Sequence, residues 1–290
     1  VYGVIKSIVS NDVLTNVGFE APVHVVAPAG SLVNPTFPAA VGGRAPLFFR
    51  VMDMLYRALA KAQPERTPIP GEGGDVLHFT GEHADGTPFA LLDIFFGGWG
   101  GRPGQDGIDG VAPMAFGSYG TIPAELMERE FPVVVDGFGY VPDTAGPGKH
   151  RGSLSIFKRW RFLGEGAAMV RTNRLIRASE GMAGGGAGAL SANVLNPDRD
   201  DREVLPNSAH MHLHVTPGDV IHHVIAGSGG HGSAWERDPE RVLEDVLDEK
   251  VSVGAANRQY GVVIDPESLT IDIDATRSLR TNATVTDSSD

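Results

Sequence analysis

Residues 97–110 read GGWGGRPGQDGIDG, so seven of these fourteen positions are glycine. Glycine is also enriched over the whole chain, at 38 of 290 residues, and it is accompanied by 20 prolines and only 7% aromatic residues. A composition of this kind is typical of many short elements joined by tight turns. The sequence therefore predicts an α+β fold that is β-rich, with short strands, Gly-rich loops and a few amphipathic helices.

Apolar spacing predicts four helices. The clearest spans about 46–63, and the others follow Thr121, Asp238 with Pro239 as the first helical residue, and Ser252. Runs of β-branched and aromatic residues bounded by Gly or Pro predict strands at 76–80, 89–95, 131–135, 154–157, 167–170, 210–215, 219–225 and 262–264.

The pattern along the chain predicts three parts. Residues 1–110 form an N-terminal part with the amphipathic helix and the Gly-rich loop, and residues 111–275 form a β-rich part. Residues 276–290 are polar, rich in Thr and Ser and without periodicity, which is typical of a flexible tail.

Charge and composition exclude several classes of protein. The chain has 24 Lys and Arg against 36 Asp and Glu, and a net charge of -12 would repel the phosphate backbone of a nucleic acid. No apolar run is long enough to predict a membrane span. The absence of cysteine fits a reducing compartment, so we expect a cytoplasmic protein. Val1 is not a methionine, and we expect the chain to be processed or one piece of something longer.

Candidate site residues lie in the Gly-rich segments. The amides of Gly98, Gly100 and Gly101 could turn toward a ligand, Arg102 could meet an anion, and Asp106 or Asp109 could handle a cation or a proton. A flexible surface loop would have the same composition, so both interpretations stay open.

A second glycine cluster, GSGGHG at 227–232, fits G-x-G-x-x-G, but the next helix begins six residues too late for a dinucleotide site. Its glycines, including Gly229 and Gly230, suit either close packing or a ligand-facing loop. A third cluster, 143–152, is Gly-rich and carries Lys149, His150 and Arg151, but it fits no P-loop, and the chain has no G-x-S-x-G motif. We therefore expect the chain not to bind ATP.

Six of the ten histidines lie between His210 and His231. In a strand, His210, His212 and His214 would share one face, which suits either a metal site or a solvated edge. Because spacing along the sequence does not show whether the three rings converge, both interpretations stay open.

Taken in order, several segments resemble the hydantoinase B/oxoprolinase family. This family includes the large subunits of ATP-dependent cyclic-amide hydrolases and of acetone and acetophenone carboxylases. The segments that carry the resemblance are Asn16-x-Gly18, Ala27-Pro28-x-Gly30, Pro38-Ala39-Ala40, 97–110, Pro123-x-Glu125 with Glu128 and Phe131-Pro132, 142–152, 217–221, 227–246, Val251-Ser252 and 260–262.

The resemblance implies a two-step reaction. An ATPase partner of the hydantoinase A type, which holds ATP and Mg²⁺, phosphorylates the carbonyl or enol oxygen of the substrate, and the large subunit completes hydrolysis. Carboxylation of a ketone and a non-catalytic scaffold role are the alternatives. The match implies that this chain is the C-terminal half of the large subunit in a hetero-oligomer, and that any divalent transition metal lies in the N-terminal half.

The resemblance also suggests roles for single residues. Arg102 and Arg151 are expected to contact an anion, together with glycines of the loops. Asp106, Asp109 and Glu125 are the candidates for proton transfer or its support.

Overall fold

The computed structural model describes residues 1–113, 120–205 and 213–287, and the chain divides into unit 1, Val1–Pro68, and unit 2, Ile69–Asp290. The division lies after Pro68, whereas the sequence analysis expected a boundary near Gly110. Its loop belongs to unit 2 because neighbouring segments bind it there; for example, the Ile69 amide donates to the carbonyl of Gly101 at 3.1 Å. Among the described residues, no helix is long and apolar enough to cross a membrane.

Unit 1 is helical and has a small core. Its helices are α1 (Tyr2–Lys6), α2 (Val17–Glu20) and α3 (Arg44–Ala60), and α3 confirms the helix predicted at 46–63. The buried apolar side chains of α1 and α3 are Val4, Phe49 and Tyr56. An apolar groove of about 530 Å³ runs beside α3 and is lined by residues such as Leu32 and Phe48.

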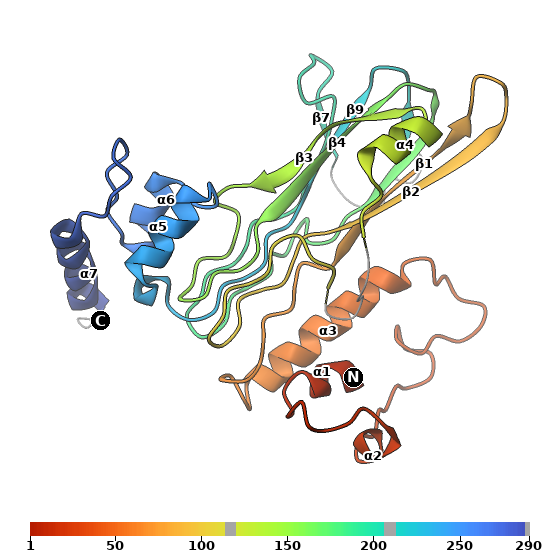
Figure 1. Cartoon of the computed structure of the whole chain (residues 1–290). Coiled ribbons are helices and arrows are strands. Elements are labelled where there is room, and N and C mark those ends of the chain that lie inside the picture. Colours follow the sequence, from red (N-terminus) through yellow and green to blue (C-terminus); the bar gives the residue numbers. More distant parts are fainter. Residues whose placement is uncertain (114–119, 206–212, 288–290) are drawn as a thin grey trace. The chain divides into compact units, whose positions relative to one another are not determined.

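Unit 2 contains two antiparallel sheets, which confirms the α+β class (Figure 1). One sheet has the order β2-β1-β5-β8 and the other the order β3-β4-β9-β6-β7. The strands are β1 (Gly74–Glu82), β2 (Pro88–Phe96), β3 (Val133–Val141), β4 (Ser155–Phe162), β5 (Gly166–Arg171), β6 (Ala192–Leu195), β7 (Glu203–Val204), β8 (Leu213–Val215) and β9 (Val220–Ile225).

The two sheets pack face to face as a sandwich. Their inner faces contribute large side chains to one core, in which the rings of Phe79 and Phe162 lie 4.6 Å apart and those of Phe95 and Trp160 lie 5.4 Å apart. Apolar residues that alternate along β1, β2 and β4 fill this core, as the period of two in a strand requires.

Two buried polar contacts also cross between the sheets. Lys158 Nζ on β4 lies 2.6 Å from an Asp93 carboxylate oxygen on β2 and forms a buried ion pair with it. His223 Nε2 on β9 lies 3.1 Å from Asp75 on β1. Because Lys158 and Asp93 are at most 2% exposed, each of these two charges depends on the other.

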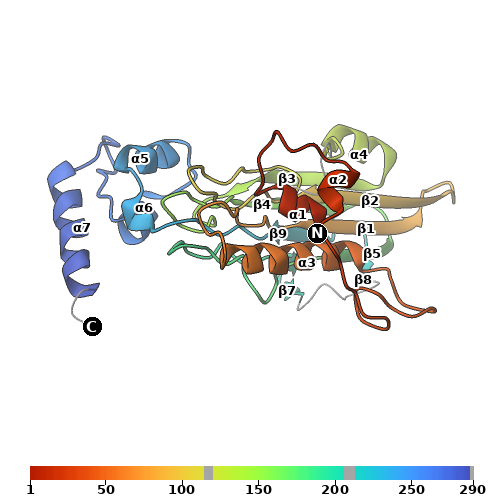
Figure 2. The same ribbon diagram turned by 90° about the horizontal axis from the view of Figure 1, so that it is seen from below.

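The helices of unit 2 are α4 (Ala124–Glu130), η1 (Ala234–Glu236), α5 (Pro239–Leu247), α6 (Val253–Tyr260) and α7 (Ile273–Asp287). Predicted caps are confirmed: the Asp238 carboxylate accepts from the Glu240 amide, and the Ser252 hydroxyl accepts from the Ala255 amide. Helices α5 and α6 share a second core around Val242, Val246 and Tyr260 and lie at the end of the sandwich away from α4 (Figure 2).

Some sequence predictions differ from the structure. The sequence analysis expected a flexible tail at 276–290, whereas α7 covers 276–287 and Thr276 Oγ1 accepts from the Val263 amide at 3.0 Å. The predicted strand at 262–264 is reduced to a single bridge between Ile264 and Ile271. Strands β6 and β7 were not predicted because they are short and carry no alternating apolar pattern.

Four extended segments lie between the sandwich and α5 (Figure 1). We call them the glycine bundle, and they are 97–110, 144–153, 179–189 and 226–232. Segment 226–232 is bonded to the other three: Gly229 O accepts from Gly101, Ser228 O from Gly146, and Gly230 O from Met182, at 2.8–3.1 Å. The bundle is therefore a backbone-bonded block and not an open surface loop.

Candidate functional site

The site is built where the glycine bundle meets α5. Asp106, Asp109 and Arg151 come together there with two residues that the sequence analysis did not single out, Arg237 after η1 and Asp245 on α5. Asp245 lies on the buried face of α5 between Val242 and Val246. A carboxylate within an apolar helix stripe was the signal in the sequence that could have revealed it.

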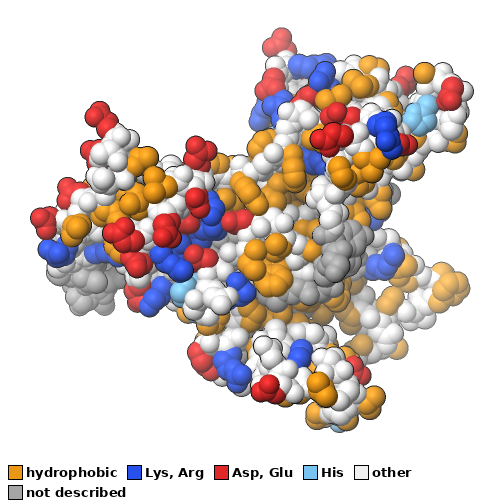
Figure 3. Space-filling view, viewed as in Figure 1, with side chains coloured by type: hydrophobic (Ala, Val, Ile, Leu, Met, Phe, Trp, Pro, Cys, Tyr) orange, Lys and Arg blue, Asp and Glu red, His pale blue; other side chains and the backbone are white. Residues whose placement is uncertain are grey.

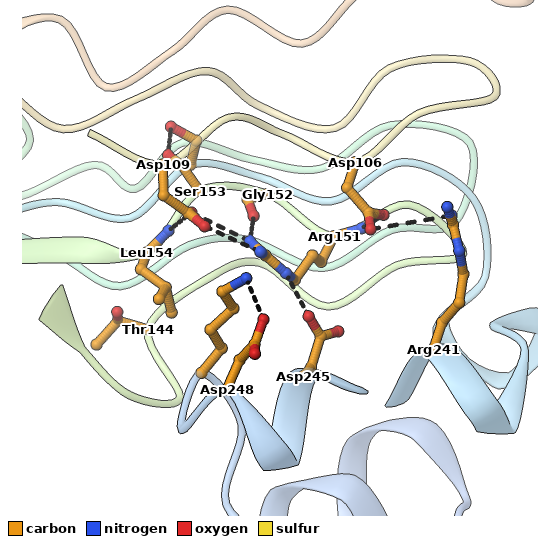
Figure 4. Close-up of polar contacts among 12 residues, drawn as sticks. Asp106, Asp109, Thr144, Arg151, Gly152, Ser153, Leu154, Arg241, Asp245 and Asp248 are labelled. Atoms are coloured by element: carbon orange, nitrogen blue, oxygen red, sulfur yellow. Dashed lines mark hydrogen bonds and ion pairs between the residues drawn. The ribbon is translucent and has the colours of Figure 1, made fainter. Parts of the chain in front are cut away.

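Arg151 joins the bundle to α5 (Figure 4). Its Nη1 and Nη2 atoms donate to the two oxygens of Asp109 at 3.1 and 2.9 Å, and its Nε atom donates to Asp245 at 2.9 Å. Burial acts against the charge, but the hydrogen bonds and charges of Asp109 and Asp245 outweigh it and raise the pKa of Arg151. Because four of the five N–H groups of the guanidinium already donate to protein oxygens and the side chain is only 5% exposed, the expected role as a substrate anion contact is not supported.

Asp106 is held by Arg237. The guanidinium of Arg237 donates to both Asp106 oxygens at 2.7 and 2.9 Å, and also to Asp245 at 2.7 Å. The backbone amide of Arg151 adds a further bond to Asp106 at 2.9 Å. Burial acts to raise the pKa of Asp106, but Arg237 and Arg151 outweigh it and the pKa is lowered.

These partners bear on the proton-transfer role expected for the two loop aspartates. Asp106 is kept ionised by two arginines, and Asp109 accepts from Arg151 and from the Leu154 amide. Carboxylates that accept several charged donors hold the surrounding structure in place and are poor proton acceptors. For Asp106 the direct proton-transfer role is not supported by this geometry, whereas a supporting role fits the contacts of both aspartates.

Two histidines pair across the bundle, and one of them faces Asp106. His150 and His231 are paired across the bundle by two backbone bonds, at 2.9 and 2.8 Å, and their ring centroids are 6.5 Å apart. His150 Nδ1 faces Asp106 at 3.9 Å. Burial, reinforced by the positive charges of Arg237 and Arg241 and by His231, lowers the pKa of His150, although Asp106 acts in the opposite direction.

The glycines proposed as ligand-binding lie inside the bundle. A Cβ atom at Gly98, Gly100, Gly101, Gly229 or Gly230 would approach a neighbouring segment closer than 3.0 Å. The amides of Gly101 and Gly230 are bonded to backbone carbonyls. These observations favour close packing at all five positions, which is the other interpretation that the sequence left open.

Arg102 and Glu125 lie in different places. Arg102 remains at the site: its Nη2 donates to the backbone oxygen of Asp106 at 3.1 Å, and its guanidinium lies over the ring of Trp99. Glu125 is exposed on α4, at the end of the sandwich away from α5, so the structure does not bring it to the other candidates (Figure 1).

The histidine-rich stretch contributes little to this site. His210 and His212 lie outside the described residues, and His214 on β8 is exposed with Nε2 3.4 Å from Glu165. Within 1–113, 120–205 and 213–287, no three His, Asp or Glu side chains are grouped so that they could hold a metal ion. The expectation that a metal centre lies outside this chain stays a prediction.

The surface around α5 carries many charges. Figure 3 shows acidic side chains with interspersed Lys and Arg over the α5–α6 end of unit 2. Arg241 is one of these residues; half of its side chain is exposed, and Nη1 lies 4.0 Å from Asp106. The inner part of the site is therefore a buried network of charged side chains, and its outer side is polar and exposed.

Comparison with known proteins shows where this arrangement belongs. An uncharacterized protein of Methanocaldococcus jannaschii is 31% identical over 95% of this chain and 48% of its own length. The putative B-type subunit of a D-/L-hydantoinase from a Pseudomonas strain is 30% identical over 91% of this chain and 44% of its own length. This chain thus spans about half the length of the curated relatives it matches.

The fold also matches a solved structure. The crystal structure of ATP-dependent caprolactamase from Pseudomonas jessenii superimposes with a TM-score of 0.77 at 24% identity, over 89% of this chain and 46% of the other. The family model described as hydantoinase B/oxoprolinase matches residues 1–234, which include all four segments of the glycine bundle. The chain belongs to the hydantoinase B/oxoprolinase family.

Proposed function

We propose that this chain forms part of the B-type subunit of an ATP-dependent cyclic-amide hydrolase of the hydantoinase/oxoprolinase type. The observation that carries the proposal is the family match over residues 1–234. The similarity to a protein named as a putative hydantoinase subunit of this type supports the same choice. An A-type ATPase subunit would bind ATP and Mg²⁺ and phosphorylate the amide oxygen, and the B-type subunit would open the activated ring in the cytoplasm.

Unit 1 supports the proposed assembly with other chains. Among the described residues, more than half of the exposed large hydrophobic side chains lie in unit 1, which has less than a quarter of the chain. On α3, Phe48 is 42% exposed and Met54 is 61% exposed. Exposed apolar surface of this extent marks an interaction site. We propose that it is covered by the rest of the B-type subunit, which would also hold any divalent metal.

The charged network supplies the rigidity that such a subunit needs. Arg151 and Arg237 connect the bundle to α5 through buried, charge-assisted bonds, and these are the strongest polar contacts that proteins make. A site placed on this block keeps its geometry while a substrate is handed over from the ATPase.

The test is reconstitution with the remaining B-type sequence and an A-type subunit. Hydantoin, 5-oxoproline and caprolactam are incubated with ATP and Mg²⁺, and ADP and ring-opened product are measured. We expect ring opening that needs ATP and this chain and does not need bicarbonate. Omission of ATP, and a complex without this chain, are the controls. Bicarbonate-dependent carboxylation of acetone or acetophenone, or no turnover of any of these substrates, would overturn the proposal.

A further inference from the structure

Asp106 and His150 have the relative placement of a carboxylate–imidazole pair. His150 Nδ1 is buried and lies 3.9 Å from Asp106 Oδ1, and it has no hydrogen-bond partner among the described residues. A carboxylate beside Nδ1 favours the tautomer in which Nδ1 carries the proton. Nε2 is then the ring nitrogen that is free to accept one.

The carboxylate of this pair is fixed independently of the histidine. Arg237 holds both oxygens of Asp106, and the Arg151 amide holds one of them. In unliganded enzymes a base and its orienting group are often farther apart than in the substrate complex, so 3.9 Å is compatible with such a pair. A short movement of the imidazole toward Asp106 would close the hydrogen bond.

The surroundings keep the imidazole ready to act as a base. The groups that face His150 are Asp106 from the loop, His231 from the neighbouring segment, Arg237 directly after η1, and Arg241 from α5. Burial and the three basic groups lower the pKa of His150 against the effect of Asp106, so that its neutral form predominates at pH 7. The His150 side chain is 15% exposed, and Nδ1 is not part of that exposed surface.

We propose that His150, oriented by Asp106, is the proton-transfer group that this chain contributes to ring opening. The inference rests on the function proposed above. Arg241, whose side chain is half exposed, is placed to contact the phosphate of the activated substrate beside this imidazole. Asp106 is then a positioning residue, which replaces the direct proton-transfer role expected from the sequence.

The proposed reaction has two proton transfers, one when water adds and one when the ring opens. When water adds to the carbon of the O-phosphorylated amide, His150 Nε2 takes one proton from the water and delivers it to the ring nitrogen. When the carbon–nitrogen bond then breaks, the proton of the new hydroxyl group moves by the same route. Both protons of the water end on the departing amine, and the carbon remains bonded to the phosphate oxygen as an acyl phosphate, which a second water hydrolyses.

The decisive variant is His150→Gln in the reconstituted complex. We expect kcat to fall by about 100-fold or more, which is the usual size of a general acid–base contribution. We also expect the acid limb of the kcat/KM pH profile to disappear.

Asp106→Asn should keep this limb but move it to lower pH, because it removes the carboxylate that stabilises the imidazolium. Lys149→Ala, next to His150 but with an exposed side chain, is the matched control and should keep wild-type kcat.

A second measurement does not depend on turnover. Nitrogen-15 NMR of histidine-labelled full chain should show His150 neutral at pH 7 with the proton on Nδ1. The Nε2–H tautomer, a charged ring at pH 7, or a His150→Gln complex with wild-type kcat and an intact acid limb would overturn the inference. If the wild-type complex opens no cyclic amide, the proposed function fails, and the tautomer still decides whether the Asp106–His150 pair exists.

Discussion

In the sandwich of unit 2, side chains such as Phe79 and Trp160 fill the space between two sheets, whereas in the glycine bundle the backbones of four segments touch one another. The sandwich can absorb a change of side chain by repacking, at a cost set by the volume left empty. The bundle has no such tolerance because its neighbouring atoms are peptide groups. Replacement of a glycine hydrogen by a methyl group in the bundle should therefore destabilise the fold more than removal of a methyl group from the sandwich.

The largest effect is expected for Gly152→Ala. A Cβ at position 152 would lie closer than 3.0 Å to the carbonyl oxygen of Ser228, and two backbones cannot separate without breaking the bundle. We expect destabilisation of more than about 4 kcal/mol, or no soluble protein. Gly120→Ala, where no atom lies within 4 Å of the added Cβ, should change stability by at most about 0.5 kcal/mol. Urea unfolding compares the two, and equal midpoints would contradict the packing argument.

A smaller effect is expected in the sandwich when Lys158 is changed to Met. The substitution leaves Asp93 buried without its cation, which costs about 3–5 kcal/mol. The double variant Lys158→Met with Asp93→Leu should regain most of this loss because no unpaired charge remains, although Trp160 Nε1 loses its acceptor. Thermal unfolding of both variants tests the pair. A double variant that is no more stable than the single one would show that the charges are not coupled.

At the edge of the bundle, Asp106→Asn should cost about 1.5–3 kcal/mol at pH 7 by weakening the bonds from Arg237. Because the folded-state pKa of Asp106 is lowered, its contribution is present above the unfolded pKa of 3.8 and is lost as pH falls through the folded value. The difference from wild type should therefore be constant near neutral pH and shrink below about pH 4. Denaturant titrations from pH 3 to 8 measure it, and a difference that grows on acidification would have the wrong sign.

The smallest effect is expected for Lys149→Ala. Its ammonium lies 3.3 Å from Glu236, and both side chains are more than half exposed. An exposed pair of this kind contributes about 0.5 kcal/mol or less, and salt screens it. Unfolding at low and at high ionic strength should give a difference that vanishes in high salt. A loss above about 2 kcal/mol would mean that Lys149 supports the bundle in a way the ion pair does not explain.

Sequence patterns predicted the sandwich better than the site. Strands β1, β2 and β9 followed from runs of β-branched and aromatic residues bounded by Gly or Pro, and α5 and α6 followed from Asp238, Pro239 and Ser252 at their starts. These features are local, since a period or a cap is determined by a few neighbouring residues. Strands β6 and β7 are held mainly by cross-strand pairing, which leaves no period in the sequence.

The candidate site could be predicted only in part. Asp106, Asp109 and Arg151 were recognised as charged residues within glycine-rich segments, but Arg237 lies 131 positions from its partner Asp106, and Asp245 lies 94 positions from its partner Arg151. Nothing in residue type alone indicates whether a carboxylate is free or saturated by arginine. That distinction depends on distances of about 3 Å, which long-range folding determines.

The sequence by itself determined the α+β class, the family and the glycine positions, because apolar periods, helix caps and ordered motifs are written in consecutive residues. Only the tertiary structure decided what the glycines do. Gly101, Gly152 and Gly230 could have cradled a ligand, but other backbones occupy the space where their side chains would be. The physical reason is that close approach of two peptide groups is a property of both segments together, and their separation in the chain conceals it.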